Sequence, residues 1–213
     1  MKVKICGITS AKDAILCLVS GAHSIGVIVD VPVESPRKIT AEKALHIKAS
    51  IAGFGREFIA VTMPKTVDEA VDICRRLEPD GIQLHGFESP EFLSELRDNV
   101  DCQIIKAIHI DGCTDMGYVE SVAEYADILL LDTKVGANVG GTGRTHDRES
   151  DLEIKARTGK RIMLSGGLNP GNVMAAAKLV RPYAVDVSSG VESSPGVKDS
   201  RKVKELIEVT RCL

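Results

Sequence analysis

The sequence contains no tryptophan, and phenylalanine and tyrosine together make up only 3% of its 213 residues. A core built from this chain must therefore be aliphatic. No apolar run approaches the roughly 20 residues that a bilayer-spanning helix needs, so we expect no membrane partner. The net charge is only −3, which provides no strongly basic surface for a nucleic acid or an anionic membrane.

Paired cysteine motifs are also missing. The six cysteines are scattered without a Cys-x-x-Cys pair, at Cys6, Cys17, Cys74, Cys102, Cys113 and Cys212. This pattern argues against a zinc site or a disulfide framework and suits a reducing compartment. A strand pattern begins within two residues of Met1, where a signal peptide would otherwise stand. We therefore expect a cytoplasmic protein without a bound metal.

Short apolar runs alternate with amphipathic segments along the whole chain. The runs predict strands at residues 2–6, 23–29, 57–63, 81–85, 103–108, 128–131, 161–164 and 183–187. Each is followed by a segment with helical periodicity, in a repeat of roughly 25 residues. Strands that are apolar throughout are typical of a parallel sheet covered by helices. Eight such units without a linker predict an α/β protein, a single-domain (β/α)₈ TIM barrel over residues 1–213.

Glycine and serine follow the last two expected strands. Ser165-Gly-Gly ends the seventh strand and Ser188-Ser-Gly ends the eighth. Glycine lets backbone N–H groups approach an anion closely, and the corresponding loops of (β/α)₈ barrels usually hold a phosphate. Ordinary turns would also use glycine, but the tandem arrangement favours a phosphate site. Its expected members are Gly166, Gly167, Ser188, Ser189 and Gly190.

Two side chains at other strand ends could transfer protons. Cys6 ends the first expected strand, and Asp132 directly follows the apolar sixth strand. At one mouth of a barrel they would place a thiolate base and a carboxylic acid on opposite faces of a substrate. The alternatives are a buried structural thiol for Cys6 and a helix-capping or ion-paired acid for Asp132.

Four further polar side chains are candidates for substrate contacts. Arg37, in a loop stiffened by prolines, could clamp a carboxylate with two hydrogen bonds or simply lie on the surface. Gln83 and His85 alternate on the fourth strand, so they either line the mouth or bond to each other inside the barrel. Asp186 alternates with valines, is expected to face inward, and then needs a buried partner.

A long glycine-rich loop follows the sixth strand. The loop runs from residue 133 to residue 148 and is richest in glycine at 138–143. Loops longer than about 12 residues commonly close over an active site, so we expect a lid. A mononucleotide-binding loop is the weaker alternative, because the glycine spacing fits neither the Rossmann nor the P-loop pattern.

Seven motifs, in chain order, resemble the phosphoribosylanthranilate isomerase family. They are KICGIT at 4–9, SPR at 35–37, IQLHG at 82–86, LDT at 131–133, GGTG at 140–143, LSGGLNP at 164–170 and VDVSSGVE at 185–192. The resemblance covers essentially the whole chain. It implies a cofactor-free Amadori rearrangement in tryptophan biosynthesis, which converts N-(5-phosphoribosyl)anthranilate to 1-(2-carboxyphenylamino)-1-deoxyribulose 5-phosphate.

The resemblance also implies roles for the candidate residues. In this family the acid of strand six protonates the ribose ring oxygen, which opens the ring to a Schiff base, and that position is Asp132. The strand-one cysteine, here Cys6, then removes the proton from sugar C2. Arg37 would bind the anthranilate carboxylate, while the glycine and serine loops would bind the phosphate. Supporting contacts to the substrate would come from Gln83, His85 and Asp186.

Two segments depart from the family pattern. Residues 26–34 lack its aromatic-rich segment, and His146-Asp147 stands where many members carry an aromatic residue. Two other functions remain open. One is the aminoaldose isomerase of histidine synthesis, which is expected to carry a carboxylate in place of Cys6 and to repeat its phosphate motifs. The other is a barrel that binds a phosphorylated ligand without catalysis. The sequence predicts either a monomer or a homodimer.

Overall fold

The computed structural model describes residues 1–111, 114–135, 138–139 and 148–211, and its strands close into a parallel barrel. The eight barrel strands are β1 (Lys2–Ile5), β2 (Ser24–Ile28), β3 (Glu57–Thr62), β4 (Gly81–Leu84), β5 (Gln103–Ile110), β6 (Ile128–Val135), β8 (Arg161–Leu164) and β9 (Ala184–Val187). Neighbours pair in parallel in the order β5-β4-β3-β2-β1-β9-β8-β6, and pairing of β5 with β6 closes the ring. The predicted TIM barrel is confirmed.

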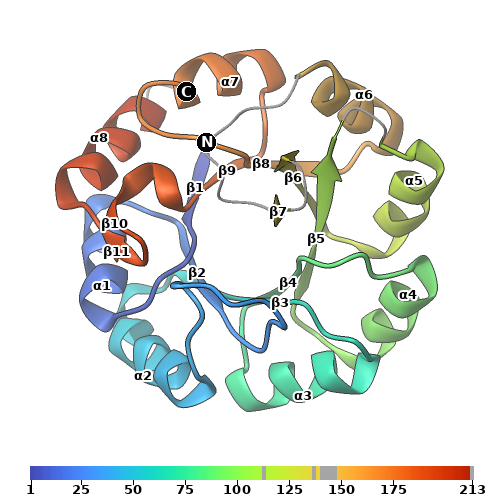
Figure 1. The fold of residues 1–213 in the computed structure, drawn as a ribbon, viewed down its shortest axis with the longest axis horizontal. Coiled ribbons are helices and arrows are strands. Elements are labelled where there is room, and N and C mark those ends of the chain that lie inside the picture. Colours follow the sequence, from blue (N-terminus) through green and yellow to red (C-terminus); the bar gives the residue numbers. More distant parts are fainter. Residues whose placement is uncertain (112–113, 136–137, 140–147, 212–213) are drawn as a thin grey trace.

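In the described part of the chain, eight α-helices form the outer ring seen in Figure 1. They are α1 (Ala11–Ser20), α2 (Ala41–Ile51), α3 (Val67–Leu77), α4 (Pro90–Asn99), α5 (Met116–Tyr125), α6 (Glu149–Thr158), α7 (Val173–Val180) and α8 (Ser200–Arg211). A short 3₁₀ helix, η1 (Ala52–Phe54), extends α2. Each α-helix follows a barrel strand, as the alternating pattern predicted.

Side-chain caps explain where several of these helices begin. The hydroxyl groups of Ser10, Thr40, Thr66 and Ser89 accept hydrogen bonds from the backbone N–H three residues later, at the starts of α1, α2, α3 and α4. Such caps satisfy N–H groups that have no partner within the helix. At the other end of α1, Gly21 adopts the left-handed conformation (φ 117°) that favours glycine.

The apolar core has two layers. The larger layer lies between the strands and the helices, and the smaller layer fills the barrel. The inner layer consists of Cys6, Ile59, Val61, Ile105, Ala107, Ile128, Leu130, Met163 and Ala184. These side chains are aliphatic or carry sulfur, as the scarcity of aromatics predicted. Cys6 therefore faces the barrel interior rather than the helices.

Three expectations about the elements were wrong or incomplete. Strands β5 and β6 continue beyond the expected ends at 108 and 131, so Asp132 lies within β6. The two-residue strand β7 (Asn138–Val139) pairs antiparallel with β6. After β9 the chain forms a 3₁₀ turn, η2 (Ser189–Val191), and an antiparallel hairpin of β10 (Glu192–Ser194) and β11 (Val197–Lys198). Strands this short and polar carry no apolar pattern. The rest of the expected lid, residues 140–143, lies outside the described part of the chain.

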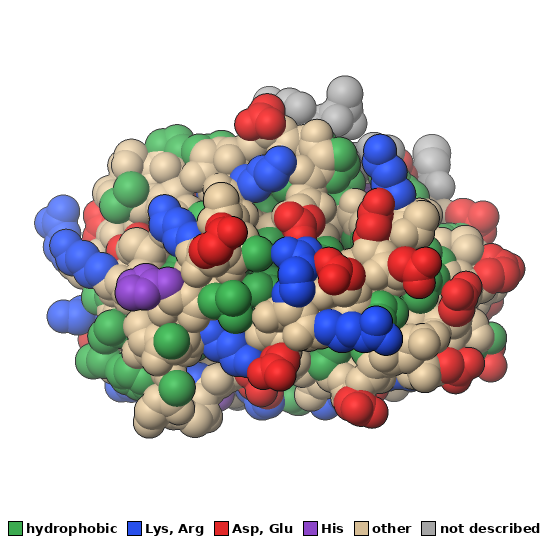
Figure 2. Space-filling model, turned by 90° about the horizontal axis from the view of Figure 1, so that it is seen from below, with side chains coloured by type: hydrophobic (Ala, Val, Ile, Leu, Met, Phe, Trp, Pro, Cys, Tyr) green, Lys and Arg blue, Asp and Glu red, His purple; other side chains and the backbone are tan. Residues whose placement is uncertain are grey.

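Charged side chains of both signs are interspersed on the face shown in Figure 2. That face carries no continuous basic surface, which agrees with the small net charge. Within the described ranges, no helix is both long enough and apolar enough to cross a membrane.

Candidate active site

Cys6 and Asp132 lie at the same end of the barrel, on strands that face each other across it. Cys6 follows β1 directly and its N–H donates to the Val187 carbonyl at 2.9 Å. Asp132 lies near the carboxyl end of β6. On one side of the ring β8 and β9 separate β6 from β1, and on the other side β2 to β5 do so. Both side chains are buried.

A fully buried lysine lies below the thiol, on the same face of the first strand. Lys4 Nζ donates to Gln83 Oε1 at 2.8 Å and to Asp186 Oδ1 at 3.0 Å. The lysine is wholly inaccessible and the other two side chains are buried as well. The ion pair between Lys4 of β1 and Asp186 of β9 is thus joined by a hydrogen bond from Lys4 to Gln83 of β4. The inward orientation expected for Asp186, and its need for a buried partner, are confirmed.

Further polar contacts lead from this cluster across the barrel to Asp132. Lysine can only donate, so Gln83 presents its carbonyl oxygen to Lys4 and its amide nitrogen to His85 Nδ1, at 3.2 Å. His85 must then carry its proton on Nε2, and that atom lies 3.5 Å from Asp132 Oδ2. A continuous polar chain therefore links Asp186, Lys4, Gln83, His85 and Asp132. Of the two alternatives for Gln83 and His85, bonding to each other inside the barrel is confirmed.

Electrostatics at Cys6 reflect burial and a mixed set of charges. Burial raises the pKa of the Cys6 thiol, Lys4 and Lys198 lower it, and Asp186 raises it further. The net direction is upward, so the resting side chain is a thiol at neutral pH. Lys4 itself stays charged, because Asp186 and Cys6 raise its pKa against the effect of burial.

His109 of β5 is a second histidine in the site, and unlike His85 it is buried. It pairs in register with Asp132, and its ring packs edge-on against His85 with centroids 5.1 Å apart. His109 Nε2 lies 3.0 Å from the His85 carbonyl oxygen and donates to it. Burial lowers the pKa of His109 to about 4, with a further contribution from His85. This imidazole is therefore neutral near pH 7.

Three of these groups have the spacing of a metal site. His85, His109 and Asp132 offer ligand atoms that all lie within 4.8 Å of one another. The proton inferred on His85 Nε2 faces Asp132, however, so this nitrogen has no lone pair free for a cation. We therefore interpret the cluster as hydrogen-bonded acid and imidazole groups.

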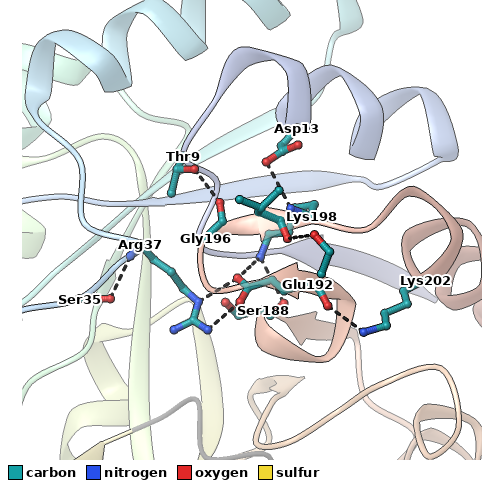
Figure 3. Close-up of polar contacts among 11 residues, drawn as sticks. Thr9, Asp13, Ser35, Arg37, Ser188, Glu192, Gly196, Lys198 and Lys202 are labelled. Carbon is teal, nitrogen blue, oxygen red and sulfur yellow. Dashed lines mark hydrogen bonds and ion pairs between the residues drawn. The ribbon is translucent and has the colours of Figure 1, made fainter.

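Arg37 is held by a carboxylate of the chain itself (Figure 3). Arg37 Nε and Nη2 donate to Glu192 Oε1 and Oε2 at 2.8 and 2.7 Å. Lys198 Nζ donates to the same Glu192 Oε1 at 2.8 Å and to the Ser188 carbonyl at 3.2 Å. Arg37 and Lys198 lower the pKa of Glu192 although burial alone would raise it. The two-point clamp was expected on a substrate carboxylate, whereas both hydrogen bonds of Arg37 go here to Glu192 of the chain itself.

Two loops meet where the phosphate site was expected. Gly166 and Gly167 both have positive φ, of 82° and 66°, which places consecutive backbone N–H groups in a conformation that suits an anion. A Cβ on Gly190 would collide with the Leu168 carbonyl oxygen. Glycine at this position is therefore required for the loop after β9 to touch the loop after β8. The buried hydroxyl of Ser188 has no hydrogen-bond partner among the described residues.

The sequence-based prediction missed several buried groups of the site. Lys4 could have been found, because strand alternation places it on the same face as Cys6. His109, Glu192 and Lys198 could not, since their positions depend on strand lengths and on a hairpin without an apolar pattern. A second buried pair, Lys106–Glu88 at 2.9 Å, was also missed.

A sequence model of the family described as N-(5'-phosphoribosyl)anthranilate (PRA) isomerase matches residues 3–209. The chain belongs to the phosphoribosylanthranilate isomerase family. The family member from Methanocella arvoryzae is 44% identical, over 99% of this chain and 98% of its own length. Phosphoribosylanthranilate isomerases are enzymes, and this chain is an isomerase of tryptophan biosynthesis.

Solved phosphoribosylanthranilate isomerases share the whole fold. The enzyme from Thermotoga maritima superposes with a TM-score of 0.87 at 35% identity, over 100% of both chains, and it is described as dimeric. A second structure, with a TM-score of 0.84 and 34% identity over 100% of both chains, holds reduced 1-(o-carboxyphenylamino)-1-deoxyribulose 5-phosphate.

Proposed function

We propose that this chain converts N-(5-phosphoribosyl)anthranilate to 1-(2-carboxyphenylamino)-1-deoxyribulose 5-phosphate without a cofactor. The observation that carries the proposal is the position of Cys6 and Asp132. They lie inside one end of the barrel, directly after β1 and on β6, beside the two adjoining glycine loops. A similar protein has been solved with a reduced form of this product.

In the proposed first step, Asp132 acts as a general acid. It protonates the ribose ring oxygen while the C1–O bond breaks, and the nitrogen lone pair forms a Schiff base with C1. The His85 N–H directed at Asp132 Oδ2 keeps that carboxyl group in place. The carboxylate that results is stabilised by the same N–H.

In the proposed second step, Cys6 acts as a general base. The cationic Schiff base withdraws electrons from C2, which makes the C2 proton more acidic, so a single thiolate suffices. Removal of the proton moves its bonding electrons to C1=C2 and neutralises the nitrogen. The enolamine then tautomerises to the ketone. Because the pKa of the resting thiol is raised by burial, the thiol must lose its proton before this step.

The substrate's two charged ends match two cationic or N–H-rich regions. We propose that Gly166, Gly167, Ser188, Ser189 and Gly190 bind the phosphate. At the other end, Arg37 would bind the anthranilate carboxylate, and Glu192 competes with it for the guanidinium group. Gln83, His85 and Asp186 would act mainly by holding Asp132 and Lys4 in place.

We further propose a single functional domain over residues 1–213 whose partner is this small molecule, with no nucleic acid. A cytoplasmic location fits the pathway. A homodimer is favoured over a monomer only by the description of the Thermotoga maritima relative as dimeric.

The experiment that tests this function is a fluorescence assay with freshly generated phosphoribosylanthranilate. We expect the substrate signal to decay at a rate proportional to the enzyme concentration. Deuterium at sugar C2 should slow single-turnover conversion if the Cys6 step breaks that bond. A chain that binds the substrate but leaves its decay at the spontaneous rate would contradict the proposal.

A further inference from the structure

Lys4 is a fully buried lysine for which the proposed reaction has so far no use. A buried ammonium group is costly unless it is paired and hydrogen-bonded. Asp186 neutralises it, but an apolar pair of similar size would fill the barrel at lower cost. The retention of a charge at this position points to a function beyond packing.

The ammonium group of Lys4 lies beside the thiol of Cys6. The point that a Cβ on Gly26 would occupy is 3.0 Å from Cys6 Sγ and 3.1 Å from Lys4 Nζ. Glycine at this position of β2 therefore opens the space that the thiol and the ammonium group share. The Lys4 ammonium group has three N–H donors, and two of them form the hydrogen bonds to Gln83 and Asp186. The third is available for sulfur.

Four charged groups act on the thiol. Lys4 comes from β1, Asp186 from β9, Lys198 from β11 and Arg37 from the loop after β2. Lys198 and Arg37 both donate hydrogen bonds to the Glu192 carboxylate. Lys4 is instead paired with Asp186, and its ammonium group reaches the space next to Cys6.

We propose that Lys4 is the positioning residue that stabilises the Cys6 thiolate, by placing a fixed positive charge beside the sulfur. Gln83 and Asp186 hold the ammonium group in this position. The proposal rests on the role of Cys6 as the base. It also explains the polar chain that runs from Asp186 to Asp132: one set of hydrogen bonds orients the groups next to both the base and the acid.

The test measures the ionisation of Cys6 directly, by the pH dependence of its alkylation with iodoacetamide, resolved by peptide mass spectrometry. In Lys4→Met we expect the midpoint for Cys6 to rise by about 1 unit or more, the size of effect that a neighbouring charge has. The acidic limb of the kcat/KM profile should move in the same direction. In Asp186→Asn the midpoint should fall.

Lys4→Met leaves Asp186 buried without its cation, so this variant is expected to be less stable. The double variant Lys4→Met/Asp186→Asn leaves no unpaired buried charge. Comparing its Cys6 midpoint with that of Asp186→Asn gives the effect of the lysine alone. An equal Cys6 midpoint in these two proteins, while the wild type turns over substrate, would overturn the role of Lys4 alone. Absence of wild-type turnover would instead overturn the proposed function.

A separate observation concerns Cys74 and Cys102, which lie outside the barrel. Cys74 belongs to α3 and Cys102 directly precedes β5, and their sulfur atoms are 3.8 Å apart although 28 residues separate them in the chain. Both are partly exposed. The contact with Cys74 lowers the pKa of Cys102, and Arg97 lowers it further. The same contact raises the pKa of Cys74.

We infer that this pair is an oxidation site that a small-molecule disulfide closes to a Cys74–Cys102 bond. The Cys102 thiolate attacks the small disulfide, forms a mixed disulfide and releases one thiolate. Cys74 then gives up its proton and attacks the Cys102 sulfur, which releases the second thiol. Two protein thiols are oxidised and one small disulfide is reduced.

The test uses oxidised glutathione on the folded chain, followed by peptide mapping. We expect a loss of two hydrogen atoms in mass, a peptide that crosslinks 74 to 102, and a Tm higher by about 5–10 °C than for the reduced protein. Cys74→Ser and Cys102→Ser should each lose the crosslink and retain isomerase activity. Glutathione adducts without the crosslink, or a crosslink that lowers the Tm, would refute the inference.

Discussion

The guanidinium group of Arg37 and the carboxylate of Glu192 form a bidentate ion pair, with N–O distances of 2.8 and 2.7 Å. The pair joins the loop after β2 to the hairpin after β9, two segments far apart in the chain (Figure 3). Lys198 also donates to Glu192. If a substrate carboxylate binds Arg37 as proposed, the Glu192 carboxylate would keep Lys198 as its cation, which would keep the cost of that exchange low.

Arg37→Ala is expected to raise KM for phosphoribosylanthranilate by about 10- to 100-fold, the equivalent of losing charge-assisted hydrogen bonds. The change in kcat should be smaller, because Arg37 does not move a proton. Steady-state kinetics measure both constants. Arg37→Lys keeps the charge but not the two-point geometry, so its KM should lie between the values of the wild type and Arg37→Ala. An unchanged KM in Arg37→Ala would contradict the clamp.

Cys6→Ser and Asp132→Asn should each reduce kcat by at least about 100-fold, the usual contribution of a general acid or base. Both replacements are close to isosteric, so the thermal unfolding midpoint should change little. Turnover and melting curves of the purified variants test this. Near-normal turnover in one variant would remove that residue from the mechanism and leave the other in place.

Gly190→Ala should destabilise the protein and weaken phosphate binding. The new methyl group would collide with the Leu168 carbonyl oxygen and lie 3.0 Å from Asn169 Cα, and both are backbone atoms that cannot rotate away. We expect a loss of about 1–3 kcal/mol in unfolding free energy and a higher KM. Gly53→Ala is the matched control, because no heavy atom lies within 4 Å of its Cβ position. Equal effects of the two substitutions would contradict this interpretation.

The barrel could be predicted because each strand is an apolar run and each helix a separate amphipathic segment. Positions of inward-facing residues followed from alternation, as for Asp186, whose buried partner proved to be Lys4. Strand ends were less predictable: β6 continues through Asp132 because its pairing with β5 extends further than its apolar residues do.

What the sequence could not reveal are contacts between segments far apart in the chain. The approach of Glu192 to Arg37 depends on a hairpin of two short polar strands. The proximity of Cys74 and Cys102 depends on how α3 packs beside the start of β5. Neither contact leaves a local pattern in the sequence. Motif spacing therefore predicted the clamp of Arg37 but not its bond to Glu192, and it did not predict that Cys74 and Cys102 lie in contact.

His109 should make the protein less stable in mild acid. Its pKa is about 4 in the folded chain, whereas an unfolded histidine titrates near 6.5. Between these values the unfolded chain binds more protons, so stability falls as the pH is lowered from about 6.5 to 4, by about 3 kcal/mol from this residue. Denaturant unfolding at several pH values measures the loss. In His109→Gln the loss over this range should be smaller by that amount, whereas exposed His46→Gln should behave as the wild type. Parallel pH curves for His109→Gln and the wild type would show that the buried imidazole does not exclude a proton.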